Sequence, residues 1–271
     1  MKKIIFAAAG LSLAVQAAEL NVYCGTPPVA SVVRAVGGDR VHVRSMMTGA
    51  QDPCVFSPSP KTVAEAREAD IFFTAGMPFE NAVAEKLLAM NPKLTVMDTS
   101  SGVTVSGDPH IWMSLPVLAK IAEDIAQALS RADPDGAKFY QNRLLDFRKH
   151  LSERHEKIKE KLVPFQGITF YVYHPVLGHF AADYGMMQQT VELDGKSPAP
   201  KQLLALINRA REENVRVVFV QPQFSDKSAR ILAERIGGQV VPVNPLAEDT
   251  VAIIEQAAER IAQAYASRQK P

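Results

Sequence analysis

Residues 137–162 read AKFYQNRLLDFRKHLSERHEKIKEKL, a long stretch that contains neither glycine nor proline. A single apolar stripe at helical spacing is formed by Tyr140, Leu144, Phe147, Leu151 and Ile158. At about 1.5 Å per residue, such a helix would be roughly 40 Å long. A helix of that length could extend along a whole domain, so we predict a rigid connecting helix and not a flexible linker.

On both sides of this helix, short apolar runs alternate with helical patterns. Before it, we expect strands at residues 20–24, 41–46, 70–74 and 94–97, and helices at 29–36, 61–69, 79–90 and 115–129. After it, we expect strands at residues 168–173, 189–192, 215–220 and 239–243, and helices at 176–184, 199–214, 225–236 and 250–267. This alternation is typical of α/β layers around a mostly parallel sheet.

The fold class predicted is therefore α/β, with two lobes that are each a mostly parallel sheet flanked by helices. One long helix joins them. We place an N-terminal lobe at residues 18–132, the connecting helix at 133–163 and a C-terminal lobe at 164–271. A chain of 271 residues is at the length where one core usually gives way to two domains.

The first residues resemble an export signal. Lys2 and Lys3 precede an apolar run at residues 4–15, and the small residues at 15–17 suit cleavage before Ala18. The run is too short to cross a bilayer core of roughly 30 Å as a helix. No cysteine stands at the end of the signal, so we predict a periplasmic protein with a cleaved signal peptide at 1–17 and no lipid anchor.

Charge and cysteine content narrow the function further. The 30 basic and 29 acidic residues are nearly balanced, and no concentrated basic face is visible, so we expect no nucleic-acid partner. In an exported protein, Cys24 and Cys54 could form a disulfide or could remain as thiols for a ligand. The sequence leaves both alternatives open.

Four short polar segments follow predicted strands or lie in comparable loops, where α/β sheets bind ligands. They are QDPCVF at 51–56, DPHIW at 108–112, YHP at 173–175 and VNPL at 243–246. The first two share an Asp-Pro-X-apolar-aromatic pattern in which X is Cys54 or His110. The prolines fix the backbone beside the presumed ligand. His179 lies five residues after His174, so a helix could bring it near the same pocket.

In order and spacing, these segments resemble the cluster A-I solute-binding proteins of zinc and manganese ABC importers, over essentially the whole mature chain. The resemblance also rests on TPP at 26–28, GGDRV at 37–41, SPS at 57–59 and VFVQPQFS at 218–225. It implies two α/β lobes joined by one long helix, with a metal ion bound in the interlobe cleft. It also implies delivery of that ion to the membrane permease of an importer.

Transferred residue by residue, the resemblance implies that His110 and His174 are metal ligands. Cys54 stands where the family has histidine, and Asn244 stands where many members have aspartate. His179 replaces a residue that is commonly tyrosine. The fourth ligand is then Asn244, Cys24, His179 or water, although the neutral Asn244 is a poor zinc ligand.

The departures from the family pattern affect the choice of metal. Thiolate and imidazole suit zinc or copper, whereas manganese favours carboxylate oxygens. Tetrahedral Cys/His sites are typical of zinc, so we predict Zn²⁺ as the bound ion, with copper as the alternative. The protein would be a monomer that binds metal and interacts with a permease.

Other functions are less well supported. The sequence has no Gly-x-Ser-x-Gly, phosphate-binding glycine loop or His-Glu-x-x-His pattern, so we do not expect an enzyme. We expect Ser225, Glu192 and Asp194 to be caps and surface groups. A metal-dependent hydrolase of the cleft, or an adhesin or metal-sensing protein on the same scaffold, remain the alternatives.

Overall fold

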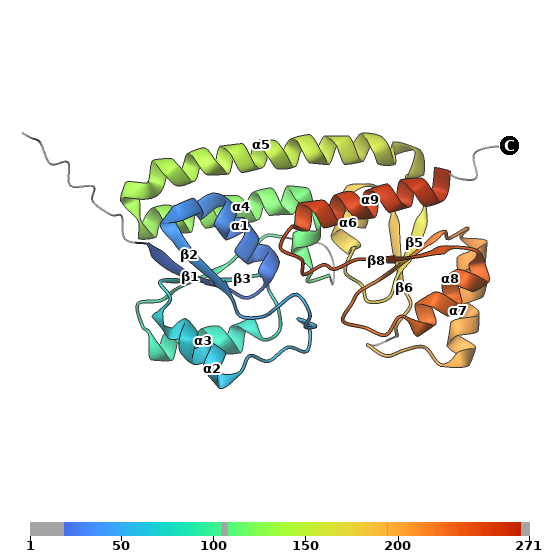
Figure 1. Cartoon of the computed structure of the whole chain (residues 1–271), viewed down its shortest axis with the longest axis horizontal. Coiled ribbons are helices and arrows are strands. Elements are labelled where there is room, and N and C mark those ends of the chain that lie inside the picture. The colour runs from blue at the N-terminus through green and yellow to red at the C-terminus, as the bar shows by residue number, and fades with distance from the viewer. Residues whose placement is uncertain (1–18, 104–107, 194, 267–271) are drawn as a thin grey trace, which may run out of the picture.

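The computed structural model describes residues 19–103, 108–193 and 195–266. The expected signal peptide and Asp194 lie outside these residues. In the described part, no helix combines the length and hydropathy that crossing a membrane would require. The chain forms two lobes with one long helix along both of them (Figure 1).

The first lobe contains a four-stranded parallel sheet in the order β2-β1-β3-β4. Its strands are β1 (Leu20–Cys24), β2 (Val41–Ser45), β3 (Ile71–Thr74) and β4 (Thr95–Asp98). Its helices are α1 (Pro27–Gly37), α2 (Pro60–Glu65), α3 (Glu80–Met90) and α4 (Leu115–Ala132). Prolines in the first turn of α1, α2 and α4 fit positions whose backbone N–H has no partner inside the helix.

The second lobe repeats this architecture with the parallel order β6-β5-β7-β8. Its strands are β5 (Thr169–Val172), β6 (Met187–Thr190), β7 (Val217–Val220) and β8 (Gln239–Pro242). Its helices are α6 (Gly178–Asp183), α7 (Pro200–Glu212), α8 (Lys227–Ile236) and α9 (Thr250–Ala266). In both sheets the first strand lies between the second and the third. The prediction of two parallel-sheet lobes is confirmed.

The long helix predicted from the sequence is α5 (Ala137–Leu162). Figure 1 shows it extending along one side of both lobes, and it packs against α1 and α4 of the first lobe and α9 of the second. The buried residues of its apolar stripe are Tyr140, Leu144, Leu151, Ile158 and Leu162. Ion pairs link its exposed face to α4 through Arg148 and Glu123, and to α9 through Arg154 and Glu255.

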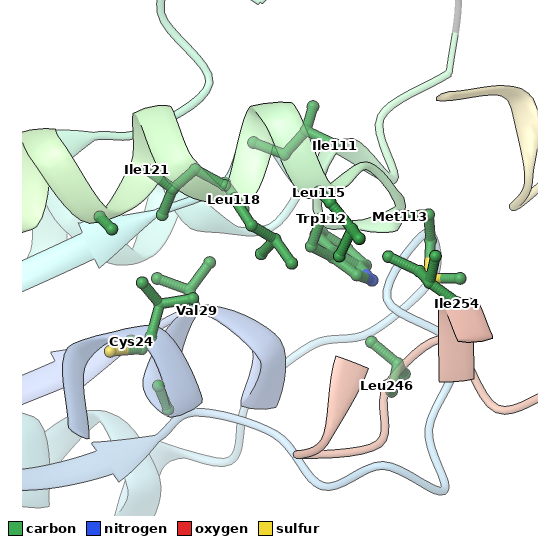
Figure 2. Close-up of a cluster of buried hydrophobic side chains, with 14 of the residues drawn as sticks. Cys24, Val29, Ile111, Trp112, Met113, Leu115, Leu118, Ile121, Leu246 and Ile254 are labelled. Carbon is green, nitrogen blue, oxygen red and sulfur yellow. The ribbon is translucent and has the colours of Figure 1, made fainter. Parts of the chain in front are cut away.

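The lobes share a large apolar core, which includes buried residues from both sheets and from the helices between them, and the second lobe also has a smaller core of its own. Trp112 is fully buried in it, and its indole N–H donates to the backbone oxygen of Pro245 at 2.7 Å. Around Trp112, Figure 2 shows Leu115 and Leu118 of α4 together with Leu246 and Ile254 of the second lobe. The junction between the lobes is therefore a packed interior.

Candidate metal centre

Cys54, His110 and His174 meet at the junction between the lobes. One ligand atom from each of these side chains lies within 4.8 Å of the other two. Bonds of about 2.0–2.3 Å place two ligand atoms of one zinc ion at most about 4.6 Å apart, so small shifts of these side chains would let all three bind the same ion. Cys54 belongs to the loop between β2 and α2, His110 immediately precedes a single 3-10 turn (Ile111–Met113), and His174 follows β5.

The two Asp-Pro-X segments of the first lobe adopt the same local turn. The Oδ1 atom of Asp52 accepts a hydrogen bond from the backbone N–H of Cys54 at 2.9 Å. In the second segment, Asp108 Oδ1 accepts one from the backbone N–H of His110, also at 2.9 Å. An aspartate that accepts from the backbone two residues on is a known turn device. The shared sequence pattern thus encodes a turn that presents the side chain at X.

His110 is oriented by the aspartate of its own turn. Its Nδ1 lies 2.8 Å from Asp108 Oδ1, and because a carboxylate can only accept, Nδ1 carries the hydrogen. In the neutral ring Nε2 then has a free lone pair, and this atom is buried without a hydrogen-bond partner among the described residues. Burial acts to raise the pKa of Asp108, but the hydrogen bonds from His110 outweigh it and lower this pKa. A carboxylate on the far nitrogen is the usual way to orient a metal-binding histidine.

His174 has an equivalent carboxylate, Glu192, whose Oε1 lies 2.7 Å from His174 Nδ1. Glu192 follows β6, the neighbour of β5, and is only 6% exposed, so the expectation that it is a cap or surface group is wrong. Gln221 pairs with the backbone N–H and oxygen of His174. The Phe224 ring stacks on the imidazole with ring centroids 5.0 Å apart. These contacts fix the ring from several sides.

The surroundings of Cys54 favour a cation. Burial is the main cause that raises the pKa of the Cys54 thiol to about 11, and the Asp52, Glu192 and Asp108 carboxylates add to it. The thiol is therefore protonated at neutral pH in the metal-free protein. A bound cation reverses this effect, because it stabilises the thiolate and is itself attracted by the same carboxylates.

The structure does not bring Cys24 into this cluster. Cys24 ends β1 with its side chain fully buried in the first-lobe core, and Figure 2 shows it beside Val29. Its burial raises the pKa of the thiol strongly, which disfavours the thiolate that a metal needs. Both Cys24 and Cys54 are free, so the structure contains no disulfide between them.

Asn244 lies in the interlobe contact and is engaged in hydrogen bonds. Its Oδ1 accepts from the side-chain N–H of Gln223 and from the backbone N–H of Leu246, both at 3.2 Å. Gln223 also donates to the backbone oxygen of Gly49 at 2.7 Å, near the start of the loop that carries Cys54. Asn244 thus helps to fix a contact between the lobes through its oxygen.

His179, on the first turn of α6, contacts the loop of His110 instead of the metal cluster. Its Nε2 lies 2.9 Å from the backbone oxygen of Asp108, and since that oxygen only accepts, Nε2 carries the hydrogen. The structure therefore brings Cys54, His110 and His174 together as candidate ligands, and it gives Asn244, Cys24 and His179 other contacts.

Similarity to known proteins extends over most of the chain. Residues 22–264 match the model of the family described as ZnuA, zinc-uptake complex component A, periplasmic. The manganese ABC transporter substrate-binding lipoprotein PsaA of Streptococcus mitis is 25% identical over 251 residues, which cover 85% of this chain and 81% of PsaA. PsaA is named a lipoprotein, so this relative does not support the expectation that the chain lacks a lipid anchor.

Solved structures give the same result. A crystal structure of ZnuA superposes with a TM-score of 0.85 at 32% identity and covers 91% of this chain and 99% of that one. A zinc-bound deletion mutant of ZnuA gives a TM-score of 0.84 at 33% identity, with 91% and 98% coverage. The laminin-binding protein Lmb of Streptococcus agalactiae, described as bifunctional with adhesin and metal transporting activity, gives 0.81 at 25% identity, with 90% and 99% coverage. The resemblance inferred from the motifs is thereby confirmed, and the chain belongs to the ZnuA family of metal-binding components of ABC importers.

Proposed function

We propose that this protein captures a transition-metal ion through Cys54, His110 and His174 and delivers it to the membrane permease of an ABC importer. The observation that carries this proposal is the convergence of the three side chains, within 4.8 Å of one another, from segments far apart in the sequence. Both imidazoles are held by a carboxylate at Nδ1, so little side-chain entropy is lost when the ion binds.

Zinc is the ion that we propose first, and copper the second. The manganese relative PsaA and the zinc-bound ZnuA structure leave the metal open within the family. The ligand set of this chain contains a thiol and no carboxylate, because the nearby Asp108 and Glu192 each hold a histidine Nδ1. Soft thiolate and imidazole ligands favour zinc or copper over manganese. Water is our choice for the fourth ligand.

For location and assembly, we propose an exported monomer that acts in the periplasm and binds its permease while loaded. The hydrolase alternative would need a general base beside the ion. Asp108 and Glu192 orient histidines instead, and Asp52 accepts from the backbone of Cys54. The adhesin alternative has the support of the Lmb neighbour, whose description combines adhesion with metal transport. We place it second, because it adds a partner without changing the metal site.

The direct test is zinc-dependent thermal stabilisation of the metal-free protein. A ligand at 100 times its Kd should stabilise the fold by about 2.7 kcal/mol. His110→Ala and His174→Ala should each remove most of this stabilisation. His150→Ala, which changes an exposed histidine on α5, is the matched control and should keep all of it. Full stabilisation in both site variants would show that zinc binds elsewhere and would reject the proposed site.

A further inference from the structure

Asp108 connects the second lobe to the first-lobe turn that carries His110. Its Oδ1 accepts from His110, while its Oδ2 accepts from the backbone N–H of Gly178 at 2.9 Å. The backbone oxygen of the same aspartate accepts from His179 Nε2 at 2.9 Å. Gly178 and His179 form the first turn of α6 in the second lobe. Side chain and main chain of Asp108 are thus both held across the lobe junction.

We propose that His179 is a positioning residue for metal binding, which holds the turn of His110 from the opposite lobe. This inference rests on the metal site proposed above. His179 does not reach the ion; it acts through the backbone of Asp108, and Asp108 in turn orients the His110 ring. Loss of the His179 hydrogen bond would let this turn move and would misalign one of the ligands.

The burial of these groups makes the contact effective. His179 and His110 are each 1% exposed, and the Asp108 side chain is 7% exposed. Water cannot readily replace a lost partner there, so the Asp108 oxygen would remain unsatisfied. The fit is also close: a Cβ atom on Gly178 would come within 2.5 Å of Asp108 Oδ2. Only glycine lets the first turn of α6 approach the aspartate in this way.

This contact has a consequence for the site as a whole. His174 belongs to the second lobe through β5, and His110 is tied to the same lobe through Gly178 and His179. Second-lobe elements therefore fix the positions of both imidazoles, although His110 belongs to the first lobe. Loss of the hydrogen-bond partner of a ligand typically lowers metal affinity by about 10- to 100-fold, and His179 holds the loop that carries such a partner, Asp108.

The test compares His179→Leu with His179→Gln. Leucine removes the donor and keeps an apolar side chain of similar bulk, whereas the glutamine amide can donate from nearly the position of Nε2. The matched control is Tyr265→Phe, which removes a partly buried hydroxyl that accepts from Arg216 N and donates to the Thr169 oxygen, at the amino end of β5. Zinc affinity is measured by competition with a chelator, and Co²⁺ absorption reports the ligand geometry.

We expect His179→Leu to lower zinc affinity by about 10- to 100-fold. The intensity of its Co²⁺ d–d bands should change, while thiolate-to-cobalt charge transfer from Cys54 should persist. His179→Gln should recover most of the affinity, and Tyr265→Phe should reduce only thermal stability. Equal affinity in the leucine variant and the wild type would refute the positioning role.

Two further outcomes would also decide the matter. If both His179 variants lost binding and the cobalt spectrum indicated one ligand fewer, His179 would be a ligand and the inference would be wrong. If the wild-type protein bound neither zinc nor cobalt, the proposed metal site itself would fail, which the wild-type titration shows before any variant is made.

Discussion

The Sγ atom of Cys54 lies 3.7 Å from Nε2 of His174, although 120 residues separate them in the sequence. The thiol comes from a loop of the first lobe and the imidazole from the end of a second-lobe strand. Because His174 Nδ1 faces Glu192, its other nitrogen is free to face the sulfur. One ion placed between these two atoms would link the lobes directly.

We expect Cys54→Ser to weaken binding of thiophilic ions most. Cys54 is a direct ligand in our proposal, so the loss of cadmium affinity should exceed the about 10- to 100-fold that an outer partner contributes. Cys54→His restores a nitrogen ligand and should retain zinc while losing much of the preference for cadmium. Competition titrations with both ions measure this. Unchanged cadmium affinity in the serine variant would exclude the thiol from the site.

Zinc binding should release a proton from Cys54. The thiol pKa of about 11 means that nearly all of the free protein holds this proton across the neutral range. Since only the thiolate binds metal, affinity should rise with pH across the neutral range, and about one proton should leave Cys54 for each zinc bound at pH 7. Calorimetric titration in buffers with different ionisation enthalpies counts the protons. Cys54→Ser should release about one fewer, and an equal count would contradict the assignment.

Much of this site was predictable because its ligands belong to motifs with a local meaning. The proline beside Cys54 and His110 marks a fixed turn, and His174 follows a strand that is buried and apolar. The strands and helices were predicted to within a few residues for the same reason: glycine, proline and capping residues bound each apolar run. The length of α5 followed from an apolar stripe without a helix breaker.

Glu192 was missed because its role depends on strand pairing, which the sequence does not state. The strand expected at residues 189–192 lies at Met187–Thr190, so Glu192 follows the strand instead of ending it. There its backbone N–H still bonds to the oxygen of Tyr173, beside His174. Cys24 was misplaced because residues 22–24 of β1 are all buried, so the strand pattern does not tell whether its last residue faces the core or the loops beyond the strand end.

Trp112 should report metal binding by fluorescence. It is the only tryptophan of the chain, and its ring lies edge-to-face with His110 at a centroid distance of 5.5 Å. An ion on His110 changes the charge next to the indole, so emission should shift or change in intensity as zinc is added. The signal should saturate at one equivalent and vanish in His110→Ala. A titration without any change, despite binding shown by calorimetry, would place the ion away from His110.

Glu80 should make stability depend on pH. It is 1% exposed; burial raises its pKa to about 7, although hydrogen bonds from the backbone N–H groups of Ala75 and Met77 act against this. Since an unfolded glutamate titrates near pH 4.3, the folded state holds this proton more tightly. The contribution of protonated Glu80 to the free energy of unfolding is full below about pH 4 and is lost as the pH rises to about 7.

The Glu80→Gln variant keeps an oxygen for the two backbone donors and carries no titrating proton. Its stability should change less between pH 4 and 7 than that of the wild type, and relative to the wild type it should gain stability above pH 7. Urea unfolding at a series of pH values, followed by circular dichroism, gives both curves. Parallel curves would mean that this carboxyl group does not titrate in the folded protein over that range.

The continuous packing around Trp112 and along α5 has a consequence for how the molecule denatures. If the lobes had no core in common, one lobe could unfold while the other stayed folded. Here the second lobe has a small core of its own, but unfolding either lobe would also expose the shared core and remove contacts of α5. Partial unfolding would therefore destabilise the other lobe. Heating the metal-free protein should therefore give a single cooperative transition, with calorimetric and van't Hoff enthalpies that agree.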